Sequence, residues 1–195
     1  MQPFVHDRHG TPVSAHRDAA VVTAGPTDRP WSMGAIPLQL SPTPVIRTER
    51  LDLVPASLEL LRAELDSAKH LEAALDARVP EDWPPGEYDR AALAFFCSRL
   101  EAEGPPSADW YVWYAVRRAR KGGKGLLIAA AGFLGPPRAG RAEIGYSVIP
   151  SARNQGIASE IVQALTEFAF GQGVGRVVAH TSDSNPASAH VLLRC

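Results

Sequence analysis

A strand pattern that passes directly into a helix pattern, over residues 142–170, constrains the fold of this chain more than any other stretch. β-Branched and aromatic residues recur over residues 142–149 and Pro150 ends the run, which predicts a buried strand. A polar loop follows over residues 151–155, and Gly156 begins the helix that completes the stretch. Apolar residues at helical spacing place one face of this helix in the core: Ile157, Ile161, Leu165 and Phe168.

The junction between this strand and this helix has the chemistry of an anion site. The first N–H groups of a helix have no partner inside the helix, and the helix dipole leaves partial positive charge there. Gly156 lets an anion approach the backbone closely, and Arg153 adds a full positive charge to the same loop. On these residues alone, the junction is either a phosphate or pyrophosphate site or a plain structural turn.

Six residues at this junction resemble a known signature. In order they are Arg153, Asn154, Gln155, Gly156, Ile157 and Ala158. They match the Arg/Gln-x-x-Gly-x-Gly/Ala pattern with which the GCN5-related N-acetyltransferase (GNAT) family binds acetyl-CoA. Residues 142–146 before the signature and residues 185–188 after it resemble the branch of that family that includes ribosomal-protein acetyltransferases. The resemblance extends from about Thr48 to the last residue, with the motifs in the family's order.

The resemblance implies an α/β (α+β) fold, with a mixed, mostly antiparallel central sheet flanked by helices. Three prolines exclude regular structure over residues 79–86. The Gly-x-Gly-x-Gly run at residues 171–175 precedes a strand, which is the wrong place for a dinucleotide-binding loop. Hydrophobic patterning predicts further strands at residues 45–54, 110–116, 126–133 and 176–181, and further helices at residues 58–75, 89–103 and 185–194.

The chain divides into two parts by composition. Residues 1–41 are rich in Pro, Gly, Thr, Asp and His without periodicity, so we expect a disordered extension in which His6 and His9 are solvated. Residues 42–195 are expected to form one acetyltransferase domain. Compared with the family, this domain lacks the usual last two strands, which leaves the edge of the strand at residues 176–181 unpaired. A truncated gene, an incomplete chain, and completion by a second copy through strand exchange in a homodimer are the three explanations.

The overall composition excludes several classes of protein. The 195 residues are 45% hydrophobic and carry a formal net charge of −1, so the chain has no electrostatic footprint for nucleic acid. No apolar run approaches the roughly 20 residues that span a bilayer, and the N-terminus has no signal pattern, so we expect a cytoplasmic protein with no membrane partner. The two cysteines, Cys97 and Cys195, predict no disulfide framework, and no metal is expected.

The resemblance also implies where acetyl-CoA would bind. In the family fold two parallel neighbouring strands separate, here residues 143–149 and 176–181, and their backbone N–H and C=O groups lose their partners. The amides of pantetheine can fill such a gap as an added strand does. We expect the backbone of Tyr146, Ser147 and Val148 to bind pantetheine. We expect the six-residue signature to bind the pyrophosphate and Asn185 to lie near the cofactor.

Acetyl transfer to an amine needs a base for the ammonium proton and an acid for the departing thiolate. Glu143 shares a strand face with Ser147 and is the first candidate for the general base, acting through a water; a structural ion pair is the alternative. The resemblance implies Ser188 as the proton donor or thiolate orienter, because Leu192 stands where the wider family has a tyrosine. The alternative for Ser188 is an ordinary first-turn serine. His180 is interpreted as a structural histidine.

Together these features predict an N-acetyltransferase that moves acetyl from acetyl-CoA directly to a primary amine. The acceptor is either a protein N-terminus or a small-molecule amine. The sequence does not discriminate between the two, because the resemblance implies an acceptor cleft formed by the variable segments before Trp110. Trp83, in the proline-rich loop, is interpreted either as a wall of the acceptor site or as the anchor of that loop. The alternative function is a non-catalytic acyl-CoA-binding protein or an inactive truncated remnant.

Overall fold

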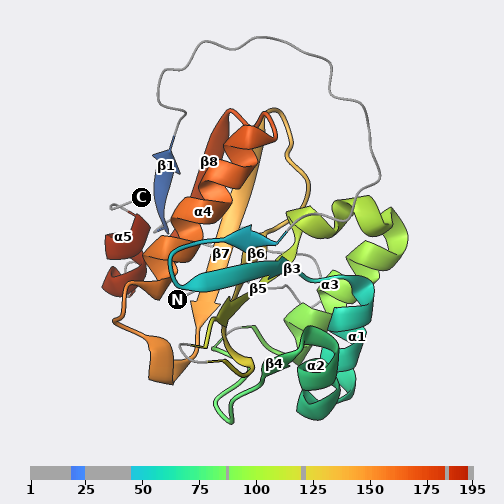
Figure 1. Cartoon of the computed structure of the whole chain (residues 1–195). Coiled ribbons are helices and arrows are strands. Elements are labelled where there is room, and N and C mark those ends of the chain that lie inside the picture. The colour runs from blue at the N-terminus through green and yellow to red at the C-terminus, as the bar shows by residue number, and fades with distance from the viewer. Residues whose placement is uncertain (1–18, 25–44, 87, 120–121, 183–184, 193–195) are drawn as a thin grey trace.

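The computed structural model describes residues 19–24, 45–86, 88–119, 122–182 and 185–192. Within these ranges one sheet of eight strands has the order β1-β8-β7-β6-β5-β3-β2, with β4 paired to β6 beside this path (Figure 1). The strands are β1 (Ala19–Ala24), β2 (Ile46–Arg47), β3 (Leu51–Pro55), β4 (Ala77–Arg78), β5 (Val112–Arg117), β6 (Gly125–Phe133), β7 (Arg141–Val148) and β8 (Arg176–Ser182).

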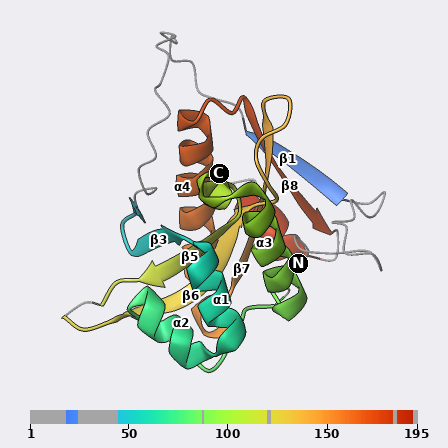
Figure 2. The same ribbon diagram turned by 90° about the vertical axis from the view of Figure 1, so that its right-hand side faces the viewer.

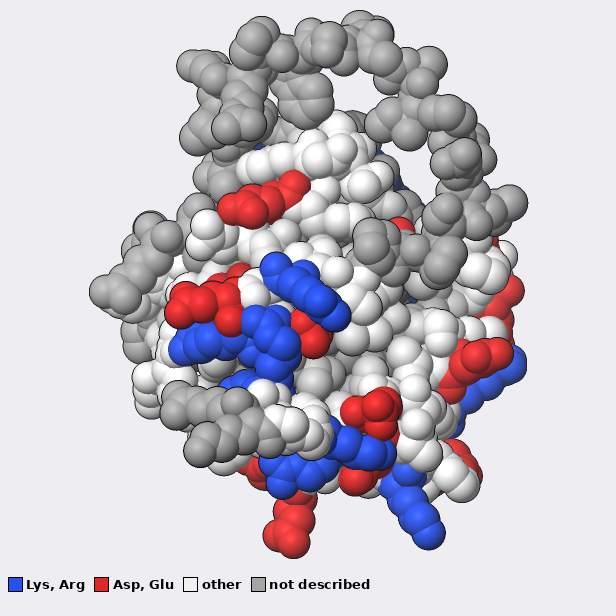
Figure 3. Space-filling view, viewed as in Figure 1, with Lys and Arg blue, Asp and Glu red and all other residues white. Residues whose placement is uncertain are grey.

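Only the β7–β8 and β4–β6 pairs are parallel among these strands; the other pairs are antiparallel. The sheet is therefore mixed and mostly antiparallel, which confirms the predicted fold class. On the face seen in Figure 3, basic and acidic side chains are interspersed, in keeping with the formal net charge of −1.

Helices cover both faces of the sheet (Figures 1 and 2). One buried cluster joins three helices to one face, with Leu61 and Phe96 fully enclosed, and a second cluster joins α4 to the other face through Ile161 and Leu165. Cys97 is buried in the first cluster, as a small core residue. The helices are α1 (Leu58–Asp66), α2 (Ala68–Leu75), α3 (Arg90–Glu103), α4 (Ile157–Gly171) and α5 (Pro186–Leu192), with 3-10 turns η1 (Pro105–Trp110) and η2 (Pro150–Ala152).

The single helix predicted over residues 58–75 is two helices, because Ser67 interrupts it. The backbone of Ser67 is extended, with φ −167° and ψ 157°. The hydroxyl of Ser67 accepts a hydrogen bond from the N–H of His70 at 3.2 Å and so caps α2. Apolar spacing continues across the break, which is why periodicity alone missed it.

The single strand predicted over residues 45–54 is likewise a hairpin. β2 and β3 pair antiparallel, and the N–H of Thr48 donates to the carbonyl of Leu51 at 3.0 Å across the turn between them. Other predicted elements lie within two residues of their expected positions over the described part of the chain, including the central strand, now β7, and the central helix, now α4.

β7 and β8 pair over only part of their length. Their register joins Arg141 to Arg176, Ala142 to Val177 and Glu143 to Val178, and ends there. β7 continues to Val148, still paired with β6. The expected separation of these two strands is confirmed.

The outer edge of β8 pairs with β1, in the register from Ala19–Ser182 to Ala24–Val177 (Figures 1 and 2). We expected this edge to be unpaired and residues 1–41 to be disordered, and Ala19–Ala24 departs from both expectations. The reason is that an open edge presents unpaired N–H and C=O groups, and a Val-Val-Thr run favours a strand. His6 and His9 lie outside the described residues.

Candidate active site

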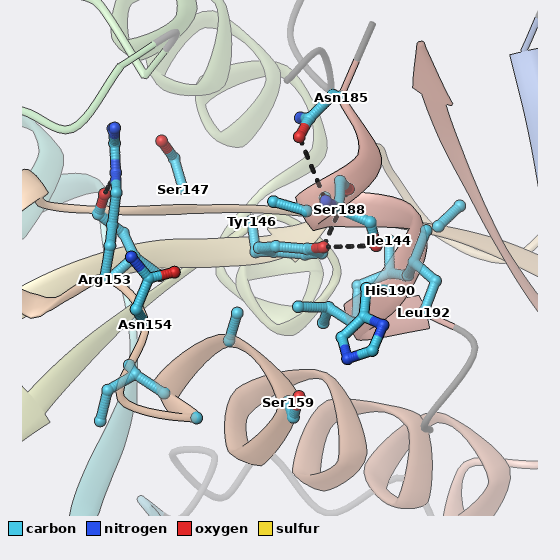
Figure 4. A pocket seen from close by; sticks show the side chains of 18 of the residues that line it. Ile144, Tyr146, Ser147, Arg153, Asn154, Ser159, Asn185, Ser188, His190 and Leu192 are labelled. Carbon is cyan, nitrogen blue, oxygen red and sulfur yellow. Dashed lines mark hydrogen bonds between the residues drawn. The ribbon is translucent and has the colours of Figure 1, made fainter. Parts of the chain in front are cut away.

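A cavity of about 640 Å³ opens where β7 and β8 separate (Figure 4). Its volume falls in the range of small-molecule sites. Three parts of the fold border it: the second half of β7, the loop that leads into α4, and the segment from β8 into α5. Among its lining residues are Tyr146, Val148, Arg153, Gly156, His180, Asn185 and Ser188.

The backbone of β7 turns every second residue toward this cavity. The C=O of Glu143 accepts from the N–H of Leu134 at 3.0 Å, and Ile149 donates to a carbonyl of the β6 strand at 3.0 Å. In an antiparallel pair only alternate residues exchange hydrogen bonds, so the odd-numbered residues of β7 face β6. The backbone groups of Tyr146 and Val148 therefore point into the gap beside β8.

Ser147 does not present its backbone to the gap, contrary to expectation. It stands opposite Ala130 in the β6–β7 register, among the residues that pair with β6. Its buried hydroxyl donates to the carbonyl of Pro85 at 2.8 Å. The period of two along a strand is the physical reason, since neighbouring residues must face opposite edges. Ser147 borders the cavity but is held by other parts of the protein.

The loop before α4 has the conformation of an anion cradle. Asn154 and Gly156 adopt left-handed backbone angles, with φ 58° and φ 73°. α4 then begins at Ile157, and among the described residues no side chain caps it. Its first N–H groups are therefore available to a ligand. Arg153 donates from Nε to the carbonyl of Val148 at 3.1 Å, which holds its guanidinium beside the cavity.

The structure brings five of the six signature residues to the cavity wall: Arg153, Asn154, Gly156, Ile157 and Ala158. The sixth, Gln155, is exposed and turns away. Its side-chain amide donates to the carbonyl of Ser151 at 3.0 Å. The contribution of Gln155 to the loop is thus its backbone, not its side chain.

Two hydroxyl groups meet on the α5 side of the cavity. The Oη atom of Tyr146 lies 2.9 Å from Oγ of Ser188 and also donates to the carbonyl of Ser188 at 3.3 Å (Figure 4). Asn185 accepts from the N–H of Ser188 at 3.1 Å, so Asn185 caps the first turn of α5. Leu192 also lines the cavity, where it brings no hydroxyl. Sequence reasoning assigned only the backbone of Tyr146, although the even-numbered face of β7 already placed its ring beside the gap.

Glu143 and His180 lie together where the strands part. Oε2 of Glu143 is 3.9 Å from Nε2 of His180, and the two side chains are 31% and 36% exposed. Glu143 belongs to the last paired position of β7, and His180 lines the cavity. His180 is therefore partly exposed and borders the site, and its interpretation as a structural histidine stays a prediction.

Trp83 belongs to a polar network beneath the proline-rich loop. Its Nε1 atom donates to Oε1 of Glu64 at 2.6 Å, while Tyr88 donates to Oε2 at 2.9 Å and Tyr114 donates to the same oxygen. Burial raises the pKa of Glu64, and these three hydrogen bonds only partly oppose the increase. Neither Glu64 nor this network was identified from the sequence. The contacts favour the interpretation of Trp83 as an anchor of its loop.

The same loop is attached to β7 and to the turn after it. Ser147 donates to the carbonyl of Pro85 at 2.8 Å, and the N–H of Ser151 donates to the carboxylate of Asp82 at 3.1 Å. The hydrogen bond from Ser151 lowers the pKa of Asp82. These contacts place the loop beside the strand that carries the cavity.

In the described part of the chain, no group of three His, Cys, Asp or Glu side chains is placed to hold a metal ion. Within the same ranges, the helices are too short or too polar to cross a bilayer.

The fold and this site define a protein with a cavity between two parted strands, bordered by the uncapped start of a helix. The acetyltransferase (GNAT) domain profile matches residues 57–195. The chain therefore belongs to the GNAT family of acetyltransferases, and the resemblance inferred from the sequence is confirmed.

Solved structures share the fold. A Vibrio cholerae protein assigned as a ribosomal-protein-serine acetyltransferase is 19% identical, with a TM-score of 0.51 over 80% of this chain and 84% of that one. An Agrobacterium tumefaciens acetyltransferase is 23% identical, with a TM-score of 0.52 over 83% and 86%. The microcin C7 self-immunity acetyltransferase MccE, solved with acetyl-CoA and AMP, is 17% identical, with a TM-score of 0.50 over 80% and 84%. Comparison with curated protein sequences finds no match.

Proposed function

We propose that this chain transfers the acetyl group of acetyl-CoA to a primary amine, with both substrates bound at once. The observation that carries the proposal is the gap between β7 and β8, which begins after Glu143 and extends to the loop at Gly156. A strand-like ligand with amide groups and an anionic end fits such a gap. Membership of the GNAT family supports the same reaction class.

The residues of the cavity fit acetyl-CoA in both chemistry and order. Backbone groups of Tyr146 and Val148 face the gap and suit the pantetheine amides. The uncapped start of α4 and the nearby Arg153 suit the pyrophosphate. When bound, acetyl-CoA supplies an activated acetyl group to the site.

Glu143 is the proposed general base. An alkylamine is mostly protonated at neutral pH, so it must lose a proton before its nitrogen can attack the thioester carbonyl. Glu143 accepts this proton through a water, and His180 at 3.9 Å orients the carboxylate. Both groups lie at the point where the strands part.

Ser188 is the proposed proton donor. As the carbon–sulfur bond breaks, the sulfur gains charge, and the hydroxyl of Ser188 supplies a proton to it. The hydroxyl of Tyr146, 2.9 Å away, then returns a proton to Ser188 and regains its own from solvent. This pair takes the place of the tyrosine that Leu192 replaces.

For the acceptor, we place a protein N-terminus first. The residues that resemble the ribosomal-protein branch support this choice, and so does the assigned activity of the Vibrio cholerae protein of the same fold. A small-molecule amine is the second candidate. The function would be tested by measuring free thiol released from acetyl-CoA with a panel of peptides and small amines.

Thermal unfolding with and without acetyl-CoA supplies the second half of this test. A ligand present at 100 times its Kd stabilises the folded protein by about 2.7 kcal/mol, which raises Tm measurably. Thiol release together with a raised Tm supports the proposal. A raised Tm without thiol release, across the whole panel, would identify a non-catalytic acyl-CoA-binding protein. The absence of both a raised Tm and thiol release would refute both functions.

A further inference from the structure

The turn between β2 and β3 packs against the start of α4 (Figure 1), where basic and acidic side chains gather on the surface (Figure 3). Arg50, in this turn, donates from Nε to Oε2 of Glu160 at 2.6 Å and from its N–H to Oε1 at 2.8 Å. Thr48 donates to Oε1 of Glu160 as well, at 2.5 Å. The carboxylate of Glu160 therefore accepts three hydrogen bonds from the β2–β3 turn.

Arg50 also binds the loop before α4. Its Nη1 donates to the carbonyl of Gln155 at 2.7 Å, and its Nη2 lies 3.5 Å from the position that a Cβ atom on Gly156 would take. The guanidinium thus spans from the helix to the loop. Arg50 does not belong to the cavity lining, so it acts from behind the loop.

This contact fixes the direction of one peptide group. In a trans peptide the C=O and the N–H point in opposite directions. Holding the carbonyl of Gln155 on the outer side therefore directs the N–H of Gly156 the other way, toward the cavity that Gly156 lines. The loop needs such support, because Asn154 and Gly156 both adopt left-handed angles and no described side chain caps α4.

Arg50 also controls the charge at this helix start. A carboxylate in the first turn of α4 would repel a pyrophosphate bound there, although it suits the helix dipole. Burial alone would raise the pKa of Glu160, but hydrogen bonds from Thr48 and Arg50 outweigh it and lower the pKa, so Glu160 is ionised at neutral pH. The guanidinium neutralises that charge at 2.6 Å.

We infer that Arg50 is a positioning residue for the pyrophosphate of acetyl-CoA, which holds the Gln155–Gly156 peptide in its binding orientation and neutralises Glu160. The inference rests on the proposed function. It assigns a role to the β2–β3 turn, outside residues 153–158, in the affinity for the coenzyme end of the donor rather than for its acetyl end.

The test compares two acetyl donors in the full chain. Acetyl-CoA carries the pyrophosphate, whereas acetyl-pantetheine carries the thioester and the amides without it. For Arg50→Gln, we expect kcat/KM with acetyl-CoA to fall about tenfold, the equivalent of losing one charge-assisted hydrogen bond. With acetyl-pantetheine we expect kcat/KM to be unchanged, and with saturating acetyl-CoA we expect kcat to be retained.

The ratio of the two kcat/KM values does not depend on how much of the enzyme is folded, so partial unfolding of the variant does not obscure the result. Glu160→Gln removes the ion pair without leaving an unpaired carboxylate at the helix start. We therefore expect the ratio of kcat/KM with acetyl-CoA to kcat/KM with acetyl-pantetheine to fall less in this variant than in Arg50→Gln. Arg62→Gln breaks an exposed ion pair to Glu101 at 2.8 Å and is the matched control, with an unchanged ratio.

Two outcomes would overturn the inference. An unchanged ratio in Arg50→Gln would show that the turn does not act through the pyrophosphate, and equal losses with both donors would show a general structural role. If the wild-type protein uses neither donor, the proposed function itself fails, and the inference fails with it.

Discussion

The hydroxyl oxygen of Tyr146 lies 2.9 Å from Oγ of Ser188, so β7 and α5 meet through two hydroxyl groups inside the cavity. The same Tyr146 hydroxyl also donates to the carbonyl of Ser188 at 3.3 Å. Because both contacts join Tyr146 to Ser188, the position of Ser188 depends on the ring of Tyr146.

Removing the hydroxyl of Ser188 should slow the chemical step. We expect Ser188→Ala to lower kcat by about 100-fold, the lower end of the usual contribution of a general acid. Tyr146→Phe should lower kcat less, because Ser188 keeps its own proton. Steady-state kinetics would measure both effects, with acetyl-CoA affinity followed by calorimetry. Ser98→Ala, on the exposed side of α3, is the control. Full kcat in Ser188→Ala would retire Ser188 as the proton donor.

Replacing Glu143 should impair the use of strongly basic amines. We expect Glu143→Gln to keep its affinity for acetyl-CoA but to lose roughly 100-fold in kcat with an alkylamine, which is mostly protonated at neutral pH. An amine of low pKa, already neutral, should lose much less. Rates across amines of graded basicity would show this trend. The same loss for every amine, or no loss, contradicts a role as base; Glu59→Gln, exposed on α1, is the control.

A side chain at Gly156 should weaken acetyl-CoA binding, because φ of 73° is unfavourable for alanine. Gly156→Ala is expected to lose about 1–2 kcal/mol of stability from the left-handed backbone. Gly173→Ala is a matched control, since Gly173 has φ of 84° in open space at the far end of α4. Chemical denaturation should show similar losses in both variants. Only Gly156→Ala should also lose acetyl-CoA affinity in calorimetry, and equal affinities would refute the cradle.

Glu64 should make the fold less stable as the pH rises. Burial raises the pKa of Glu64 above its ordinary value of 4.5, so the folded protein favours the protonated form. Its contribution to stability is therefore fully present below the unfolded pKa, and it is lost as the pH rises toward the folded pKa. Glu64→Gln stays neutral and should lose less stability over this window. Denaturation curves from pH 4 to pH 8 would test this, and parallel curves for both proteins would contradict it.

The sequence predicted the central strand and helix well because their ends are chemically marked. Pro150 ends the strand and Gly156 precedes the helix, and the spacing of the apolar residues identifies each element along its length. Ser67 carried no such mark, since serine occurs both inside helices and at their caps. β1 was missed because the polar composition around it gave no period, and its partner, β8, lies more than 150 residues away in the chain.

The site was predictable in its backbone and less so in its side chains. The loop from Arg153 to Ala158 was found from its local pattern. The pairing of Tyr146 with Ser188 depends on how α5 docks against β7, and the contact between Arg50 and Glu160 depends on where the β2–β3 turn lies. Such contacts join distant parts of the chain, and one sequence does not reveal them.

The loop around Trp83 is fastened at three places: to Glu64 on α1, to Ser147 on β7, and through Asp82 to Ser151. A loop held in this way has little freedom to change its conformation. An acceptor that binds beside this loop would therefore meet a preformed surface and would not induce a new one. A change of acceptor there would require new side chains on this loop. A change in the length of the loop would instead disturb all three of its attachments together.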